Sequence, residues 1–254
     1  MNIIKIYGGL GNQMFQYAFG RAMDTKVVAF DTSWGQVPHD PPRPFNLDKL
    51  RTNLITVNSN SGLNVVKETS EQFYRYIPEY LKLTNSYFFG YWQNRNYFKD
   101  ILPELMTEFK VRPEYRTEEF DILKAKIILD QESIALHIRR GDYLTKGHHL
   151  LPIEYYAEAL NQVEGTLYVF SDDIPWCKTQ FENAIFIDQP DYLSFELMRY
   201  CTHKITANST FSLWAALLSF SDGKIFAPKR WRLNDTEENA VEQEKFIPDN
   251  WIRL

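Results

Sequence analysis

The sequence predicts an α/β protein made of two Rossmann-like halves, and three observations support this. Short apolar strands alternate with helical segments along most of the 254 residues, which is the βα rhythm of parallel sheets flanked by helices. The rhythm breaks at the charged segment 112–132 and then restarts. Two predicted strands run into polar turns, GGLGNQ and HIRRGD, at the edge where such sheets bind ligands. We expect an N-terminal domain at 1–130 and a C-terminal domain at 131–254, facing each other across a cleft.

The N-terminal half begins with a strand at residues 3–6, followed by GGLGNQ and a helix that carries apolar residues through Met23. A second strand, KVVAFD, ends at Asp31. The prolines of VPHDPPRPF, residues 37–45, exclude regular structure and indicate a surface loop. Residues 70–110 are expected to be mainly helical, with the aromatic stretch YFFGYWQNRNYF in the middle.

The C-terminal half repeats the alternation more regularly. The expected strands are IALHI, TLYVFSDD, AIFID, HKITA and KIFAP, and the expected helices are YYAEALNQV, FELMRYC and FSLWAALLSF. We find no internal repeat and no low-complexity tract.

Composition narrows the class of protein. A net charge of −5 argues against a dedicated nucleic-acid binder. Neither cysteine, Cys177 or Cys201, lies in a metal-ligand pattern, so free thiols are expected and a structural zinc site is not. The longest apolar runs are about eight residues, whereas a membrane-spanning helix needs roughly twenty. We expect a cytoplasmic protein and leave peripheral contact with the inner membrane open.

The turn GGLGNQ, between a strand and a helix, is a natural cradle for an anion, because backbone N–H groups and the helix dipole point at it. Gly9 and Gly11 fit the dinucleotide fingerprint G-x-G-x-x-G, but Met14 stands where the third glycine belongs. Asp31 lies where a ribose-binding acid would be expected, so NAD binding is a competing interpretation. A tight turn without a ligand is another. Asn12 offers a side-chain amide to the turn or to a ligand.

The turn HIRRGD places two arginines at the carboxyl end of a strand. Arginine presents a planar fork that matches phosphate oxygens. Because side chains alternate along a strand, one of Arg139 and Arg140 can face a ligand while the other pairs with Asp142 or another acid. A structural salt-bridge cluster is the alternative. We discount an adhesion role for the RGD tripeptide, because it lies at the end of a predicted strand.

Two further turns fall on the same predicted edge. Asp172 and Asp173 follow a strand, and a helix-capping or base-binding role fits them better than a metal site. Asn208, Ser209 and Thr210 precede a long apolar helix, whose first N–H groups suit a phosphate. Together these turns predict a diphosphate site built from arginines and helix ends, without a metal.

These motifs resemble those of glycosyltransferase family 11, the α-1,2-fucosyltransferases of bacteria and animals. The resemblance covers nearly the whole chain, in the order GGLGNQMFQYAFGRA, GYWQNRNYF, HIRRGDY, FSDDIPWC, YCTHKITANSTFSLWAALL, IFAPKRW and IPDNWIRL. It implies a GT-B fold and transfer of fucose from GDP-β-L-fucose to the 2-hydroxyl of a terminal galactose in an oligosaccharide. The reaction it implies inverts the anomeric carbon and needs no metal and no other cofactor.

The resemblance also assigns roles to residues. The family's HxRRxD motif maps onto His137, Arg139, Arg140 and Asp142, and the first arginine is expected to hold the β-phosphate of GDP. The expected catalytic residues are Arg139, Asp142 and Asn12. Donor binding is expected of His137, Arg139, Arg140, Asp172, Asn208, Ser209, Thr210, Gly9 and Gly11, and acceptor binding of Gln13, Tyr91, Trp92 and Gln93, with a core role open for the GYWQ residues.

Asp142 is the first candidate for the general base, followed by Glu154, His148 and His149. A phosphate oxygen that takes the proton is the alternative to all four. Two other functions stay open from the sequence: an NAD-dependent reductase that uses GGLGNQ and Asp31, and a sugar-nucleotide or glycan-binding protein without catalysis.

Overall fold

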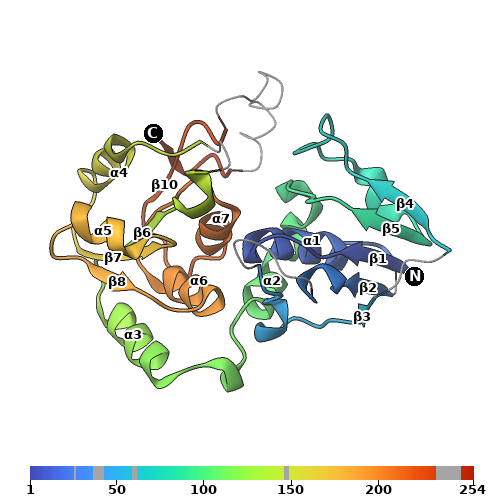
Figure 1. Cartoon of the computed structure of the whole chain (residues 1–254), viewed down its shortest axis with the longest axis horizontal. Coiled ribbons are helices and arrows are strands. Elements are labelled where there is room, and N and C mark those ends of the chain that lie inside the picture. The colour runs from blue at the N-terminus through green and yellow to red at the C-terminus, as the bar shows by residue number, and fades with distance from the viewer. Residues whose placement is uncertain (26, 37–42, 59–61, 146–148, 233–246) are drawn as a thin grey trace. The chain divides into compact units, whose positions relative to one another are not determined.

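The computed structural model describes residues 1–25, 27–36, 43–58, 62–145, 149–232 and 247–254. The chain divides into two compact units (Figure 1). Unit 1 contains Met1–Lys110, and unit 2 contains residues 111–232 and Pro248–Leu254. This division falls before the boundary that the sequence suggests near Asp130, because the segment 111–130 packs with unit 2.

Unit 1 has a five-stranded sheet in the order β3-β2-β1-β5-β4, and every neighbouring pair is parallel (Figure 1). The first two strands match those expected from the sequence. The strands are β1 (Asn2–Lys5), β2 (Val28–Asp31), β3 (Thr56–Val57), β4 (Asn64–Lys67) and β5 (Ser86–Phe89).

Helix α1 (Leu10–Arg21) follows β1 and is almost entirely buried. Its aromatic residues pack on strand and loop aromatics: Phe19 contacts Phe88 edge-on and stacks on Trp92, with ring centroids 4.6 Å apart. The other helical segments of unit 1 are short, namely η1 (Ser33–Gln36), η2 (Leu47–Lys49), η3 (Pro78–Lys82), η4 (Arg95–Tyr97), η5 (Lys99–Ile101) and α2 (Leu102–Glu108).

The expectation that residues 70–110 are mainly helical was wrong. Strand β5 lies within that stretch and pairs with both β1 and β4, so it is an interior strand of the sheet. Aromatic residues favour strands, and Tyr87 and Phe88 of β5 are buried. Most of the predicted loop at 37–45 lies outside the described residues.

Unit 2 has a six-stranded, fully parallel sheet in the order β11-β10-β9-β6-β7-β8. All five strands expected in this half are present, and the two-residue strand β11 was not expected. The strands are β6 (Ser133–Ile138), β7 (Thr166–Ser171), β8 (Ile185–Ile187), β9 (His203–Ile205), β10 (Ile225–Ala227) and β11 (Ile252–Arg253).

The helices of unit 2 include the three that the sequence predicts (α4, α6 and α7) and two more, α3 and α5. They are α3 (Glu118–Leu129), α4 (Ile153–Leu160), α5 (Ile174–Gln180), α6 (Asp191–Tyr200) and α7 (Thr210–Leu217), with the short turns η6 (Pro113–Tyr115) and η7 (Gly141–Tyr143). Helix α6 packs against both α3 and α7.

A buried carboxylate explains why the segment 111–130 belongs to unit 2. Glu196 on α6 is fully buried and accepts a hydrogen bond from the backbone N–H of Val111. The same carboxylate pairs with Arg116 at 3.5 Å and with Lys124 of α3 at 3.7 Å. A buried charge must be paired to be tolerated, so these contacts hold the segment on α6.

Both cysteines are free and buried, as the sequence predicts. Among the helices that the structure describes, none is long and apolar enough to cross a membrane.

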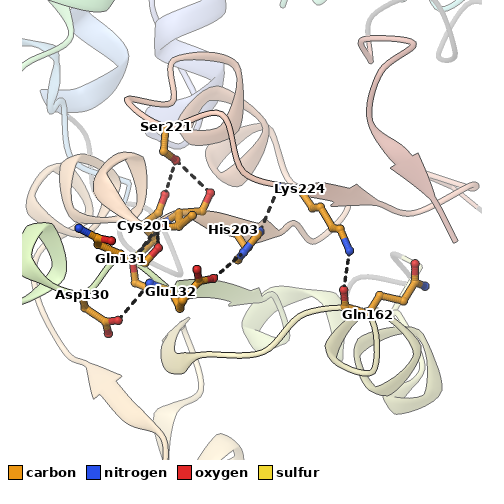
Figure 2. A network of polar contacts seen from close by, with 10 residues as sticks. Asp130, Gln131, Glu132, Gln162, Cys201, His203, Ser221 and Lys224 are labelled. Carbon is orange, nitrogen blue, oxygen red and sulfur yellow. Dashed lines mark hydrogen bonds and ion pairs between the residues drawn. The ribbon is translucent and has the colours of Figure 1, made fainter.

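A polar network closes the amino edge of the unit 2 sheet (Figure 2). The ring of His203 accepts the backbone N–H of Lys224 at 3.0 Å and approaches Glu132 at 3.5 Å. The Lys224 ammonium donates to the carbonyl of Gln162 at 2.8 Å, which joins β10 to the turn after α4. Ser221 donates to the Cys201 carbonyl at 2.8 Å. These contacts stabilise the amino edge of the sheet. The opposite, carboxyl edge carries Arg139 and Arg140.

Gly165 leads into β7 at this amino edge, and the register of the sheet demands a glycine there. Its φ is +144°, and a Cβ would overlap the Glu132 carbonyl oxygen that accepts the Thr166 N–H. We expect Gly165→Ala to lower the free energy of unfolding by about 2 kcal/mol or more, because both strain and overlap oppose it.

Urea unfolding followed by circular dichroism measures this effect. The matched control is Glu164→Ala at the exposed neighbouring position, which should change stability by no more than about 0.5 kcal/mol. Equal stability of the two variants would show that the start of β7 can shift register at little cost.

Candidate active site

The carboxyl edge of the unit 2 sheet has a topological switch point. From β6 the chain proceeds through β7 and β8 to one side, then returns and proceeds through β9, β10 and β11 to the other side. The gap between the turns that follow β6 and β9 is where α/β sheets of this kind bind ligands. HIRRGD follows β6 and NST follows β9, so the sequence motifs lie at this point.

Arg139 lies at the centre of this edge and holds two carboxylates. Its guanidinium contacts Asp142 at 2.6 Å and Asp172 at 2.9 Å, while about a fifth of its side chain stays exposed. Its guanidinium also lies over the ring of Tyr143, 5.6 Å from the centroid. Burial acts to lower the pKa of Arg139, but Asp172 and Asp142 outweigh it and raise the pKa above its usual value. The guanidinium is therefore charged and held in position.

Arg140 contacts different residues from Arg139. Its Nε donates to Asp173 at 3.1 Å, and its guanidinium lies 3.8 Å from the centre of the Trp176 ring. Asp173 also caps α5 by accepting the N–H of Trp176 at 3.2 Å. The sequence suggested that one arginine would face a ligand and the other would pair with an acid. In this structure both arginines are paired.

Asp172 joins the ends of β6 and β7. One carboxylate oxygen accepts the backbone N–H of Arg140 at 2.8 Å, and the other contacts the Arg139 guanidinium. Gly141 makes room for it, because a Cβ at that position would overlap the Asp172 carboxylate. We call Arg139, Arg140, Asp142, Asp172 and Asp173 the arginine cluster.

His137 lies beneath the arginine cluster, on β6. Its side chain is buried beside Phe211, and its Nδ1 has no hydrogen-bond partner in the described structure. Burial, and then the charge of Arg139, lower the pKa of His137 to about 3. The imidazole is therefore neutral at physiological pH. A buried polar atom without a partner is costly unless a ligand or water satisfies it.

The turn after β9 is held by its asparagine. The Asn208 amide donates to the carbonyls of His149 and Trp231, at 2.7 and 2.9 Å, and the Asn208 carbonyl accepts the Tyr143 hydroxyl at 2.9 Å. Ser209 caps α7 through its Oγ, 3.4 Å from the Phe211 nitrogen. The Asn208 side chain thus fixes the turn rather than pointing to a ligand, and the start of α7 lies beside the neutral His137.

The candidates for a general base are placed as follows. Asp142 pairs with Arg139, which suits an orienting carboxylate. Glu154 is exposed on α4. Burial and the charge of Arg230 lower the pKa of His149, and His148 lies outside the described residues.

Unit 1 has its own switch point, between β1 and β5. GGLGNQ follows β1 and GYWQ follows β5, so these two motifs lie side by side at the carboxyl edge. Gly8 has a φ of +82°, and Gly9 begins α1 with open space at its Cβ position. The Asn12 side-chain oxygen accepts the Gln93 amide at 3.0 Å, which links the two turns.

Two residues of unit 1 that are expected to bind the acceptor, Gln13 and Trp92, are buried and contact other residues of the protein. Gln13 is buried, donates to the carbonyls of Gly8 and Pro44, and accepts the N–H of Asn46. The side chain of Trp92 is buried, so the core role left open for GYWQ describes it better than stacking on a sugar.

Two further residues of these motifs, Gly11 and Tyr91, pack within unit 1. Gly11 is buried within α1. Tyr91 is half-buried and packs on Tyr7, with ring centroids 4.6 Å apart.

Asp31, the acid on which the NAD interpretation depends, is buried. Its carboxylate accepts from Tyr87 at 2.7 Å and from Lys5 at 3.1 Å, and it also accepts the Ser33 N–H. These contacts tie β2 to β1 and β5, which favours a structural role over recognition of a ribose.

The sequence interpretation missed the two aromatic partners of the arginines, Tyr143 and Trp176. Both were within the quoted motifs, HIRRGDY and FSDDIPWC, and an aromatic ring close to an arginine in such a turn is the signal that could have identified them. Among the described residues, no group of three or more His, Cys, Asp and Glu side chains could hold a metal ion.

The family model "Glycosyl transferase family 11" matches residues 1–254. The chain is 30% identical to an α-1,2-colitosyltransferase of Escherichia coli, over 99% of this chain and 98% of that protein. It is 26% identical to galactoside α-(1,2)-fucosyltransferase 2 of Mus musculus, over 86% of this chain and 68% of that protein.

Among solved structures, the fucosyltransferase NodZ from Bradyrhizobium superimposes with a TM-score of 0.56, covering 86% of this chain and 93% of NodZ. At 11% identity this likeness concerns the fold alone, and it agrees with two Rossmann-like units of the GT-B-like type. The family match spans the whole chain and includes every motif of both sheet edges. The chain therefore belongs to glycosyl transferase family 11.

Proposed function

We propose that this glycosyltransferase moves L-fucose from GDP-β-L-fucose to the 2-hydroxyl of a terminal galactose in an oligosaccharide. The observation that carries the proposal is Arg139, a charged and oriented guanidinium at the switch point of unit 2. Relatives named as galactoside α-(1,2)-fucosyltransferases support the donor and the linkage.

In this proposal Arg139 binds the β-phosphate of GDP. A diphosphate brings more negative charge than the single carboxylate of Asp172, so it can replace Asp172 on the guanidinium while Asp142 keeps the orientation. As the bond from the anomeric carbon to the phosphate oxygen breaks, negative charge grows on the phosphate. A fixed guanidinium then binds more strongly in the transition state than in the ground state.

The other residues of unit 2 complete the donor site. Arg140 is held by Asp173 and Trp176 and adds a second positive charge. The first N–H groups of α7, at Ser209 and Thr210, face the same edge and suit a phosphate oxygen. Neutral His137 offers Nδ1 to the nucleotide or to a water.

Unit 1 contributes the acceptor side in this proposal. Asn12, Tyr91 and Gln93 lie together at its carboxyl edge and offer amides and an aromatic face to a sugar. The galactose oxygen attacks the anomeric carbon from the face opposite GDP, which inverts its configuration. Asp142 is the first candidate to take its proton, and in a largely dissociative transition state a phosphate oxygen takes it instead.

A second donor is favoured by one specific observation. The relative with 30% identity over 99% of this chain is a colitosyltransferase. Colitose is the 3-deoxy counterpart of L-fucose, so the two donors differ by a single hydroxyl group. Donor choice then depends on whether the site contains a partner for that hydroxyl.

Replacement of the central arginine tests the mechanism. We expect Arg139→Ala to lower kcat for transfer by about 10²–10³, because the phosphate loses its preorganised donor. Arg139→Lys should recover only part of the rate, since a lysine keeps the charge but not the fork. The measurement is GDP release with a galactoside acceptor, with folding checked by circular dichroism.

Two control variants make the arginine result interpretable. Arg139→Ala leaves the Asp172 carboxylate without its guanidinium partner, and adding Asp172→Asn removes that unpaired charge. The double variant should have the same low kcat as Arg139→Ala alone. Arg21→Ala removes an arginine from an exposed ion pair with Glu108 in unit 1 and should keep the wild-type rate. A kcat near wild type for Arg139→Ala would contradict the mechanism.

Donor choice is tested by competition between GDP-fucose and GDP-colitose on lactose and lacto-N-biose, with the linkage of each product determined by NMR. We expect kcat/KM for GDP-fucose to be higher by about tenfold or more, because a site that binds a hydroxyl rejects the analogue that lacks it. The reverse preference would replace fucose by colitose, and a linkage other than α-1,2 would overturn the acceptor assignment.

Metal dependence is tested with a chelator. Because arginines and helix ends supply the positive charge in this proposal, excess EDTA should leave the transfer rate unchanged. A loss of rate with EDTA that Mg²⁺ or Mn²⁺ restores would show that the reaction requires a metal.

A further inference from the structure

Unit 1 contains a half-buried carboxylate, Glu68, that the mechanism above does not use. Glu68 follows β4, at the same carboxyl edge as GGLGNQ and GYWQ. One of its oxygens accepts the backbone N–H of Tyr91 at 2.7 Å, and the other accepts that of Trp92 at 3.2 Å. Among the residues that the structure describes, no cation pairs with this carboxylate. Its partners are therefore the N–H groups of one turn.

The turn at residues 90–93 needs this support, because its backbone is strained. Trp92 has a φ of +57°, which is unfavourable for a bulky residue. Gly90 is required for close packing, since a Cβ there would lie 2.5 Å from the Glu68 Cβ and 2.8 Å from the Trp92 ring. A strained conformation persists only where its surroundings hold it, and such strain gathers at functional sites.

The turn is connected to the motif after β1. Gln93 donates to the Asn12 side-chain oxygen at 3.0 Å. Gln16 of α1 donates to the Gly90 carbonyl at 3.3 Å and accepts the Tyr7 N–H at 3.0 Å. Glu68 thus lies at one end of a polar chain whose other end is Asn12.

We propose that Glu68 is a positioning residue whose carboxylate holds the turn at 90–93 and, through Gln93, fixes the amide of Asn12 for the acceptor sugar. The role of Asn12 in acceptor binding rests on the proposed function, whereas the coupling of Glu68 to Asn12 is a property of unit 1 alone. Both carboxylate oxygens act as acceptors, so the charged form is the one that holds the turn. A protonated carboxyl has an O–H that must donate, and one backbone N–H then loses its acceptor.

This arrangement makes the turn sensitive to pH. Burial raises the pKa of Glu68 from its usual 4.5 to about 7, because its backbone hydrogen bonds only partly offset the lost hydration. The titratable groups that interact with Glu68 are Tyr7, Tyr80 and Tyr97, whose pKa values are raised above the usual 10.0, so they are neutral at this pH. Deprotonation of Glu68 therefore tightens the turn as the pH rises through about 7.

Rising pH has opposite effects on the stability that Glu68 contributes and on its hold on the turn. The folded-state pKa lies above the unfolded value, so folding favours the protonated form, and the contribution of Glu68 to stability declines as the pH rises from about 4.5 to about 7. Relative to Glu68→Gln, the wild type should lose Tm over that interval. The charged form of Glu68 holds the turn best, yet it is the form that the folded state disfavours. This pattern is expected of a residue kept for function and not for stability.

NMR titration of the unliganded protein tests the coupling without requiring catalysis. The backbone amides of Tyr91 and Trp92 and the side-chain amides of Asn12 and Gln93 should shift with one common midpoint near pH 7. Glu68→Gln should abolish that titration. The matched control is Glu71→Gln, at an exposed carboxylate three positions away, which should leave it unchanged. Side-chain amides of Asn12 and Gln93 that do not follow Glu68 would overturn the proposal.

Kinetics test the consequence for the acceptor. The acceptor KM of the wild type should rise about tenfold as the pH falls from 8 to 6, the size expected for one charge-assisted hydrogen bond. Glu68→Gln should show the higher KM at both pH values, with GDP affinity unchanged by calorimetry. A KM profile of Glu68→Gln parallel to that of the wild type would contradict a positioning role. A wild type that transfers neither fucose nor colitose would refute the proposed function, and the NMR titration would still decide the role of Glu68.

Discussion

The carboxyl edge of the unit 2 sheet depends on one carboxylate, that of Asp172. It joins the ends of two neighbouring parallel strands, because it contacts the guanidinium of Arg139 and the backbone N–H of Arg140 at the same time. Gly141 permits this approach. Positive charges at the end of a strand repel one another and are costly to desolvate unless anions hold them. Asp172 therefore holds the Arg139 guanidinium and the backbone of Arg140 in place, while Asp173 pairs with the Arg140 guanidinium.

Both units use the same principle to assemble a site. In each parallel sheet the first strand has earlier-added strands on one side and later-added strands on the other, and the turns after the two strands that meet there carry the quoted motifs. In unit 2 those turns hold arginines and a helix start, which suit a diphosphate. In unit 1 they hold amides and a half-buried tyrosine, which suit a neutral sugar, and the Glu68 carboxylate after β4 accepts two N–H groups of the turn after β5. The division of chemistry between the units thus agrees with the transfer of a sugar from a charged donor to an uncharged acceptor.

The sequence predicted the regular parts of this structure and failed where local signals conflict with tertiary ones. The strands of unit 2 were found because each is a short apolar run between turn residues, and HIRRGD was found because two arginines at a strand end are rare. Strand β5 was missed because SYFF has no alternation that separates it from the helical segments nearby. The burial of Trp92 and Gln13 could not be read from the sequence, because it depends on distant partners, Phe19 and Pro44, that no local pattern reveals.

The geometry of GDP on unit 2 tests the account most directly. A crystal structure with GDP should show the Arg139 guanidinium within hydrogen-bond distance of the β-phosphate, with Asp172 displaced from it and Asp142 still in contact. An Arg139 that stays paired with both carboxylates, while the diphosphate lies elsewhere, would contradict the account.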